Sequence, residues 1–208
     1  LSFHASALSG EETSTLIANL YNSSIKTHAA LNAFYNYSAN TGDKGLLSDS
    51  LEAINESNEI LNQIQTALSE QFPAELEEMT AEYQAFKKLL NANINFVKDN
   101  GYADLRLVDD LSRNNSELSS KLEKFKDKII QETGYKQNQS AQSARELAVT
   151  LSKMVATYTA RSTSSVVQTM QGSDTEKPLD VIALEVDKQF SQLLENPSNS
   201  GETKRLLE

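Results

Sequence analysis

An arginine interrupts one of the apolar helical stripes in the sequence. Residues 140–171 are expected to form a long helix whose apolar spacing is broken near Arg161 and resumes at Val166. A faint internal repeat, offset by about 130 positions, would place this helix parallel to the first helix of the chain. Five side chains would then meet: Arg161, Tyr158, Ser165, His28 and Tyr35. Because arginine can grip a carboxylate with two parallel hydrogen bonds and the others add single ones, this pattern predicts a binding site for a small organic anion.

Pairing of Arg161 with a protein carboxylate is the alternative. A buried guanidinium group without an anion is costly. The expected helix carries no Asp or Glu between Glu146 and Asp174, and the first helix carries none between Glu12 and Asp43. A pairing acid would therefore come from another helix, toward which Arg161 would extend along the surface.

Three asparagines occupy positions where helical spacing predicts leucine. Asn58, Asn93 and Asn115 each fall within an apolar stripe and are expected to be buried polar residues. In coiled coils, such an asparagine fixes the register at a cost in stability. The three residues either fix helix packing or line a wet cavity that holds a ligand.

Signatures of catalysis and of metal binding are missing from the sequence. The two histidines, His4 and His28, belong to no paired metal motif, and the chain has no cysteine. No nucleophile elbow, dinucleotide fingerprint or phosphate loop occurs. We therefore expect no enzymatic activity, no metal and no cofactor.

The negative charge of the chain disfavours partners that are themselves negatively charged. Its net charge is -10 and its isoelectric point is about 4.8, which opposes binding to nucleic acid or to anionic lipid. No window approaches the length of an apolar membrane-spanning segment. The sequence also has no signal peptide and no initiator Met, so we expect a soluble piece of a larger protein. The absence of cysteine is common in periplasmic and surface proteins.

The spacing of apolar residues predicts an all-α fold. With only 7 Gly and 3 Pro, the chain has long uninterrupted stripes. Helices are expected over 11–41, 45–72, 76–100, 105–133, 140–171 and 178–195, with a last helix after residue 201. Short connections predict long antiparallel helices in one or two stacked four-helix bundles. Residues 1–208 would form one domain, with possible sub-bundles 45–133 and 1–44 with 137–208.

Two stretches carry a family resemblance. Residues 100–123 combine Asn-Gly-Tyr-Ala-Asp-Leu-Arg with an acidic helix, and residues 172–194 combine Gly-Ser-Asp with Val181, Val186 and Phe190. Both resemble the turns of helical bimodular sensor domains in bacterial methyl-accepting chemotaxis receptors. More loosely, the chain is similar to the N-terminal domain of the type IV pilus chemotaxis receptor.

The resemblance implies a function in signal transduction. The chain would be the periplasmic sensor domain of a chemoreceptor or sensor kinase, anchored by flanking transmembrane helices. It would bind a small molecule, form a weak homodimer, and pass a helix displacement across the membrane. The alternative is an extracellular structural or host-interaction protein, shaped as a helical rod.

Overall fold

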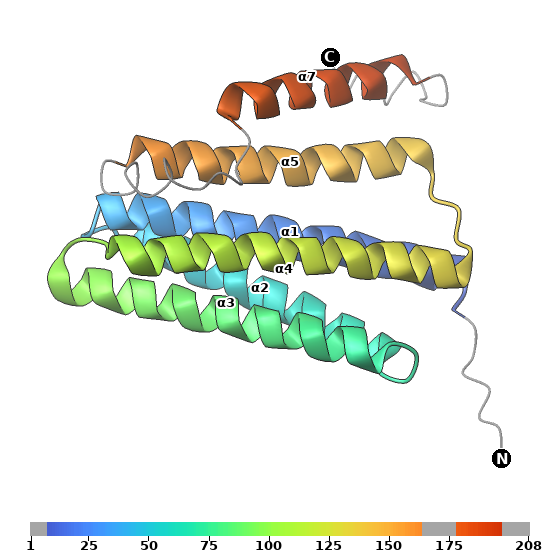
Figure 1. Cartoon of the computed structure of the whole chain (residues 1–208), viewed down its shortest axis with the longest axis horizontal. Coiled ribbons are helices and arrows are strands. Elements are labelled where there is room, and N and C mark those ends of the chain that lie inside the picture. The colour runs from blue at the N-terminus through green and yellow to red at the C-terminus, as the bar shows by residue number, and fades with distance from the viewer. Residues whose placement is uncertain (1–7, 164–177, 197–208) are drawn as a thin grey trace.

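The computed structural model describes residues 8–163 and 178–196, which form six helices (Figure 1). Helices account for 87% of these residues, and no strand occurs among them, so the predicted all-α fold is confirmed. The helices are α1 (Gly10–Ala39), α2 (Lys44–Leu68), α3 (Pro73–Asn100), α4 (Leu105–Thr133), α5 (Gln139–Ser162) and α7 (Leu179–Glu195).

Local sequence signals set the ends of most helices. Ser9 and Glu12 form a reciprocal capping box at the start of α1, and the Asp104 side chain accepts two backbone N–H groups at the start of α4. Gly101 and Gly134 follow α3 and α4 in the left-handed conformation, with φ of 78° and 62°. These caps let short turns reverse the chain between long helices.

Helices α1 to α4 run alternately up and down around a shared core (Figure 1). The core is dense with large side chains from all four helices, among them Phe34, Ile64, Phe86 and Leu111. One continuous cluster thus draws on both residues 1–44 and residues 45–133, and these two ranges do not form separate sub-bundles.

Helix α5 lies outside this bundle, parallel to α1 and packed on it, and α7 lies on the outer side of α5 (Figure 1). The buried residues of α5 are Leu147 in its first half and the small residues Ala156, Thr157, Thr159 and Ala160 in its second half. The apolar face predicted for this helix, which consists of Leu147, Leu151, Met154 and Tyr158, is buried only in part. Leu147 is 5% exposed, whereas Leu151 is 37% exposed and Tyr158 is 65% exposed. Small side chains allow α5 to approach a surface of α1 that is already crowded with aromatic residues.

The predicted helix 140–171 ends earlier in the structure. Ser162 is its last helical residue, and Thr163 adopts an extended conformation with φ −85° and ψ 112°. The predicted helix after residue 201 lies outside the described residues. The helix predicted to reach residue 72 also ends early, at Leu68, and a hydrogen-bonded turn leads from there into Pro73.

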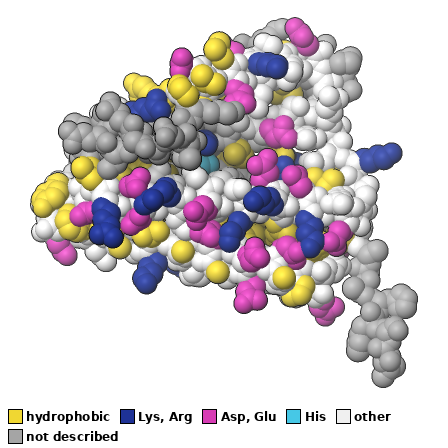
Figure 2. All heavy atoms as spheres, viewed as in Figure 1, with side chains coloured by type: hydrophobic (Ala, Val, Ile, Leu, Met, Phe, Trp, Pro, Cys, Tyr) yellow, Lys and Arg dark blue, Asp and Glu magenta, His cyan; other side chains and the backbone are white. Residues whose placement is uncertain are grey.

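The surface is mixed in character (Figure 2). Acidic and basic side chains alternate over α4, whereas hydrophobic side chains gather over α7. In the two ranges that the structure covers, no helix combines the length and the apolar character needed to cross a bilayer.

Candidate functional site

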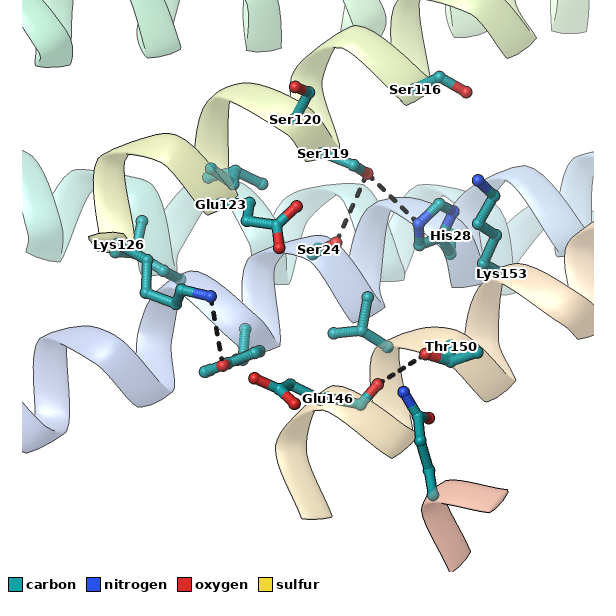
Figure 3. Close-up of a pocket in the computed structure, with 15 residues that line it drawn as sticks. Ser24, His28, Ser116, Ser119, Ser120, Glu123, Lys126, Glu146, Thr150 and Lys153 are labelled. Atoms are coloured by element: carbon teal, nitrogen blue, oxygen red, sulfur yellow. Dashed lines mark hydrogen bonds between the residues drawn. The ribbon is translucent and has the colours of Figure 1, made fainter. Parts of the chain in front are cut away.

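A cleft of about 530 Å³ opens between α4 and α5, with α1 as its floor (Figure 3). Both helices pack on α1, yet they do not form a packed interface with each other. Gln189 of α7 also lines the cleft. Its size falls within the range of small-molecule sites in proteins.

Each of the three main walls contributes side chains separated by seven residues. Tyr21 and His28 lie on α1, Glu146 and Lys153 on α5, and Glu123 and Ser116 on α4. Seven residues are close to two helical turns, so the members of each pair share one face. Because α4 is antiparallel to α1 and α5, one member of each pair lies at one end of the cleft and the other member lies at the opposite end (Figures 1 and 3).

The two ends of the cleft carry opposite charges. One end holds the carboxylates of Glu123 and Glu146, and the other holds Lys153 beside His28 (Figure 3). Hydroxyl groups occupy the space between them, and they belong to Ser24, Ser119, Ser120 and Thr150. The cleft therefore has an acidic end, a hydroxyl-rich middle and a basic end.

His28 is the centre of a buried hydrogen-bond network. It is 3% exposed, and the Asn115 amide nitrogen lies 2.8 Å from its Nδ1. Its Nε2 lies 3.3 Å from the Ser119 hydroxyl, which in turn lies 3.5 Å from the Ser24 hydroxyl. Since the Asn115 amide donates to Nδ1, the proton of the neutral ring sits on Nε2 and is donated to Ser119.

The surroundings of His28 keep its ring neutral. Burial, together with the nearby charge of Lys153, lowers the pKa of His28 to about 4. A neutral ring with its proton on Nε2 cannot accept the proton of the Ser119 hydroxyl. Although Asn115, His28 and Ser119 follow the order of a catalytic triad, their hydrogen bonds favour a binding role over nucleophilic catalysis.

Lys126 is built into the wall near the acidic end. The residue is 7% exposed, and its ammonium nitrogen lies 3.4 Å from the Tyr21 hydroxyl, 3.3 Å from Asp127 and 5.1 Å from the Tyr21 ring centroid. Burial favours the neutral amine, but the Tyr21 and Asp127 contacts outweigh it and raise the pKa of Lys126. Burial raises the pKa of the Tyr21 hydroxyl as well. The charge of Lys126 is thus balanced within the protein.

Other polar groups of the cleft lack such partners within the part of the chain that is described. Glu123 and Lys153 form no ion pair there, and the Glu146 carboxylate accepts only one amide hydrogen bond, from Gln142 at 2.9 Å. The Gln189 side-chain oxygen is buried without a hydrogen-bond partner. These groups can bond to a solute without first breaking an ion pair.

The structure does not assemble the site predicted around Arg161. Helices α1 and α5 are parallel neighbours, as that prediction required, but His28 and Tyr35 face Lys153, Ala156 and Thr157. Tyr158 points to solvent because it lies about 200° around the helix from both Ala156 and Ala160, which are buried. Arg161 is partly exposed and lines none of the described cavities, and Ser165 lies outside the described residues.

The three asparagines differ in their surroundings. Asn93 is 1% exposed and donates to the Leu107 carbonyl of α4, at 2.9 Å, so it ties α3 to α4. Asn115 is buried against His28, as described above. Asn58 was wrongly predicted as buried: it is partly exposed, and its neighbour Ser57 takes the inner position, 2.9 Å from Ser23.

Most residues of the cleft were missed from the sequence. Its serines and charged residues look like ordinary solvent-facing positions in an amphipathic helix. The repeated separation of seven residues was a usable signal, but it becomes visible only when the three helices are known to be neighbours. Among the described residues, no cluster of metal-binding side chains occurs.

Comparisons with protein-family models, with curated proteins and with solved structures found no match.

Proposed function

We propose that this chain is the extracytoplasmic sensor domain of a transmembrane chemoreceptor or sensor kinase. In this proposal, a small solute binds in the cleft between α1, α4 and α5. The main support is that unpaired charges and hydroxyl groups from α4 and α5 face each other across a cavity of about 530 Å³. Flanking transmembrane helices would hold the domain on the periplasmic side of the membrane.

The cleft also suggests how binding would produce a signal. A solute that bonds to both α4 and α5 favours conformations in which these two helices are closer. Helix α5 rests on α1 through Ala156, Thr157 and Ala160, and small side chains offer little resistance to a shift of an ångström or two along the helix axis. Helix α7 packs on α5 and would move with it.

A thermal-shift screen of small metabolites tests this function. We expect at least one solute to raise the melting temperature of the wild-type domain, because binding to the folded state alone stabilises it. Thr150→Trp should abolish the shift by filling the middle of the cleft. Val155→Trp is the matched control, since Val155 lies on the same helix and is 47% exposed. A stabilising solute whose effect survives Thr150→Trp would contradict a site in the cleft.

A helical interaction protein is the second candidate function. It is favoured by large apolar side chains that α5 and α7 expose: Leu151, Val155, Tyr158, Val181 and Leu184. The sequence of the full-length gene distinguishes the two candidate functions. Two transmembrane helices flanking this domain would support the sensor, whereas a secreted chain without them would support the helical interaction protein.

A further inference from the structure

The charged side chains that line the cleft indicate which charges its ligand would carry. Glu123 and Glu146 face each other from α4 and α5 at one end, whereas Lys153 lies at the other end (Figure 3). Lys126 is also near the acidic end, but Asp127 and Tyr21 already hold its ammonium group. The unpaired charges therefore favour a positive group at one end of a ligand and a negative group at the other.

We propose that the cleft binds a short peptide in zwitterionic form. Its ammonium group lies between Glu123 and Glu146, and its carboxylate binds Lys153. This inference rests on the proposed function, since it names the class of solute that the cleft takes.

The spacing of Glu146 and Lys153 along α5 indicates the length of the ligand. Glu146 and Lys153 are seven residues apart on α5, which corresponds to about 10 Å along the helix axis. An extended tripeptide also measures about 10 Å, whereas one amino acid spans only about 3.5 Å. A tripeptide can reach both ends at once, and a free amino acid cannot.

The middle of the cleft matches the backbone of such a ligand. Peptide groups carry one N–H donor and one carbonyl acceptor per residue. The Ser119 hydroxyl, which accepts from His28, can donate to a ligand. The Thr150 hydroxyl donates to the Glu146 carbonyl at 2.9 Å and can accept from a ligand, as can the unpartnered Gln189 oxygen. These groups can satisfy peptide N–H and C=O groups that lose water on binding.

The same charges disfavour simpler ions. A linear dicarboxylate would bring its second negative group beside Glu123 and Glu146. A linear diamine would bring its second positive group beside Lys153. Like charges at such short range repel, so for each of these ligands the repulsion at one end offsets the attraction at the other and weakens binding.

Isothermal titration calorimetry with triglycine tests the proposal. We expect triglycine to bind the wild-type domain, and N-acetyl-triglycine and triglycine amide to bind roughly tenfold more weakly, since each lacks one terminal charge. Glycine should also bind more weakly than triglycine. Glu123→Gln and Lys153→Met should each weaken triglycine binding roughly tenfold.

Matched controls separate these effects from the loss of charge in general. Glu117→Gln and Lys124→Met change exposed charges of α4 that do not line the cleft, and both should leave triglycine binding unchanged. Equal binding of triglycine and its capped forms would overturn the proposal, as would equal effects of the cleft and control variants.

The titration and the thermal-shift screen together distinguish an error in the peptide proposal from an error in the proposed function. If triglycine does not bind but another solute stabilises the domain and loses its effect in Thr150→Trp, only the peptide inference is overturned. If neither triglycine nor any solute in the screen acts through the cleft, both are overturned.

Discussion

At the scale of single residues, His28 gives the sharpest prediction. Its folded-state pKa of about 4 lies below the usual value of 6.5, so between these values the unfolded chain binds more protons than the folded one. The free energy of unfolding should therefore fall as the pH drops from about 6.5 to about 4, by up to about 3 kcal/mol from this residue. Urea unfolding at pH 7 and pH 4.5 measures the change.

A substitution separates the contribution of His28 to this pH dependence of stability from the contribution of the carboxylates. His28→Gln keeps a polar side chain but has no group that titrates in this range. The variant should lose less stability than the wild type between pH 7 and pH 4.5. Equal losses in the two proteins would show that His28 does not control this pH dependence.

Asn93 and Asn58 form a matched pair for the role of buried amides. Asn93→Ala removes the hydrogen bond that the buried Asn93 amide donates to the Leu107 carbonyl and empties the space that the amide fills, so it should lower the free energy of unfolding by roughly 1–2 kcal/mol. Asn58→Ala should change it by less than about 0.5 kcal/mol, because Asn58 is partly exposed. Similar costs in denaturant titrations would contradict this assignment.

Helical spacing predicted some of these residues and missed others for a physical reason. Asn93 and Asn115 were identified as buried because each lies in a stripe with large apolar neighbours. On α2 the inner face includes the small polar residue Ser57, so a stripe drawn through large residues pointed to Asn58 instead. Arg161 was misplaced because its surroundings depend on which face α5 turns to α1, and periodicity within one helix does not determine this.

At the scale of helices, Gly101 gives a prediction about the α3–α4 turn. Its φ of 78° is unfavourable for any residue with a side chain, so Gly101→Ala should destabilise the fold by about 1 kcal/mol. Gly42 follows α1 without a positive φ, and a Cβ atom there would meet nothing within 4 Å. Gly42→Ala should therefore be neutral within about 0.5 kcal/mol in the same unfolding assay, and a cost equal to that of Gly101→Ala would contradict the assignment.

The boundaries of α3 and α4 were predictable because Pro73, Gly101 and Gly134 mark them directly. Helix α5 was harder to predict. Its large apolar residues indicated a buried face, but the surface of α1 already carries bulky side chains such as Tyr35 and Leu31. In the second half of α5 the buried residues are small, such as Ala156 and Ala160, whereas in the first half Leu147 is buried as predicted. Which residues of α5 are buried thus depends on the partner helix.

At the scale of the whole molecule, we predict weak self-association. The chain carries a net charge of -10, which opposes the approach of a second copy. The exposed apolar residues of α5 and α7 favour some contact but lie among polar positions. Sedimentation at micromolar concentration should show mainly monomer with a small dimer fraction that grows at higher salt, since salt screens the repulsion. A tight dimer at these concentrations would contradict this prediction.

The most direct test of the account is a map of where a solute binds. The ¹⁵N-labelled domain is titrated with the solute that raises its melting temperature most, and amide chemical shifts are recorded. We predict that the largest changes fall on the cleft walls, at Ser24, Ser119 and Lys153 and their neighbours. Changes centred on Arg161 or on the exposed face of α5 and α7, or the absence of any stabilising solute, would contradict it.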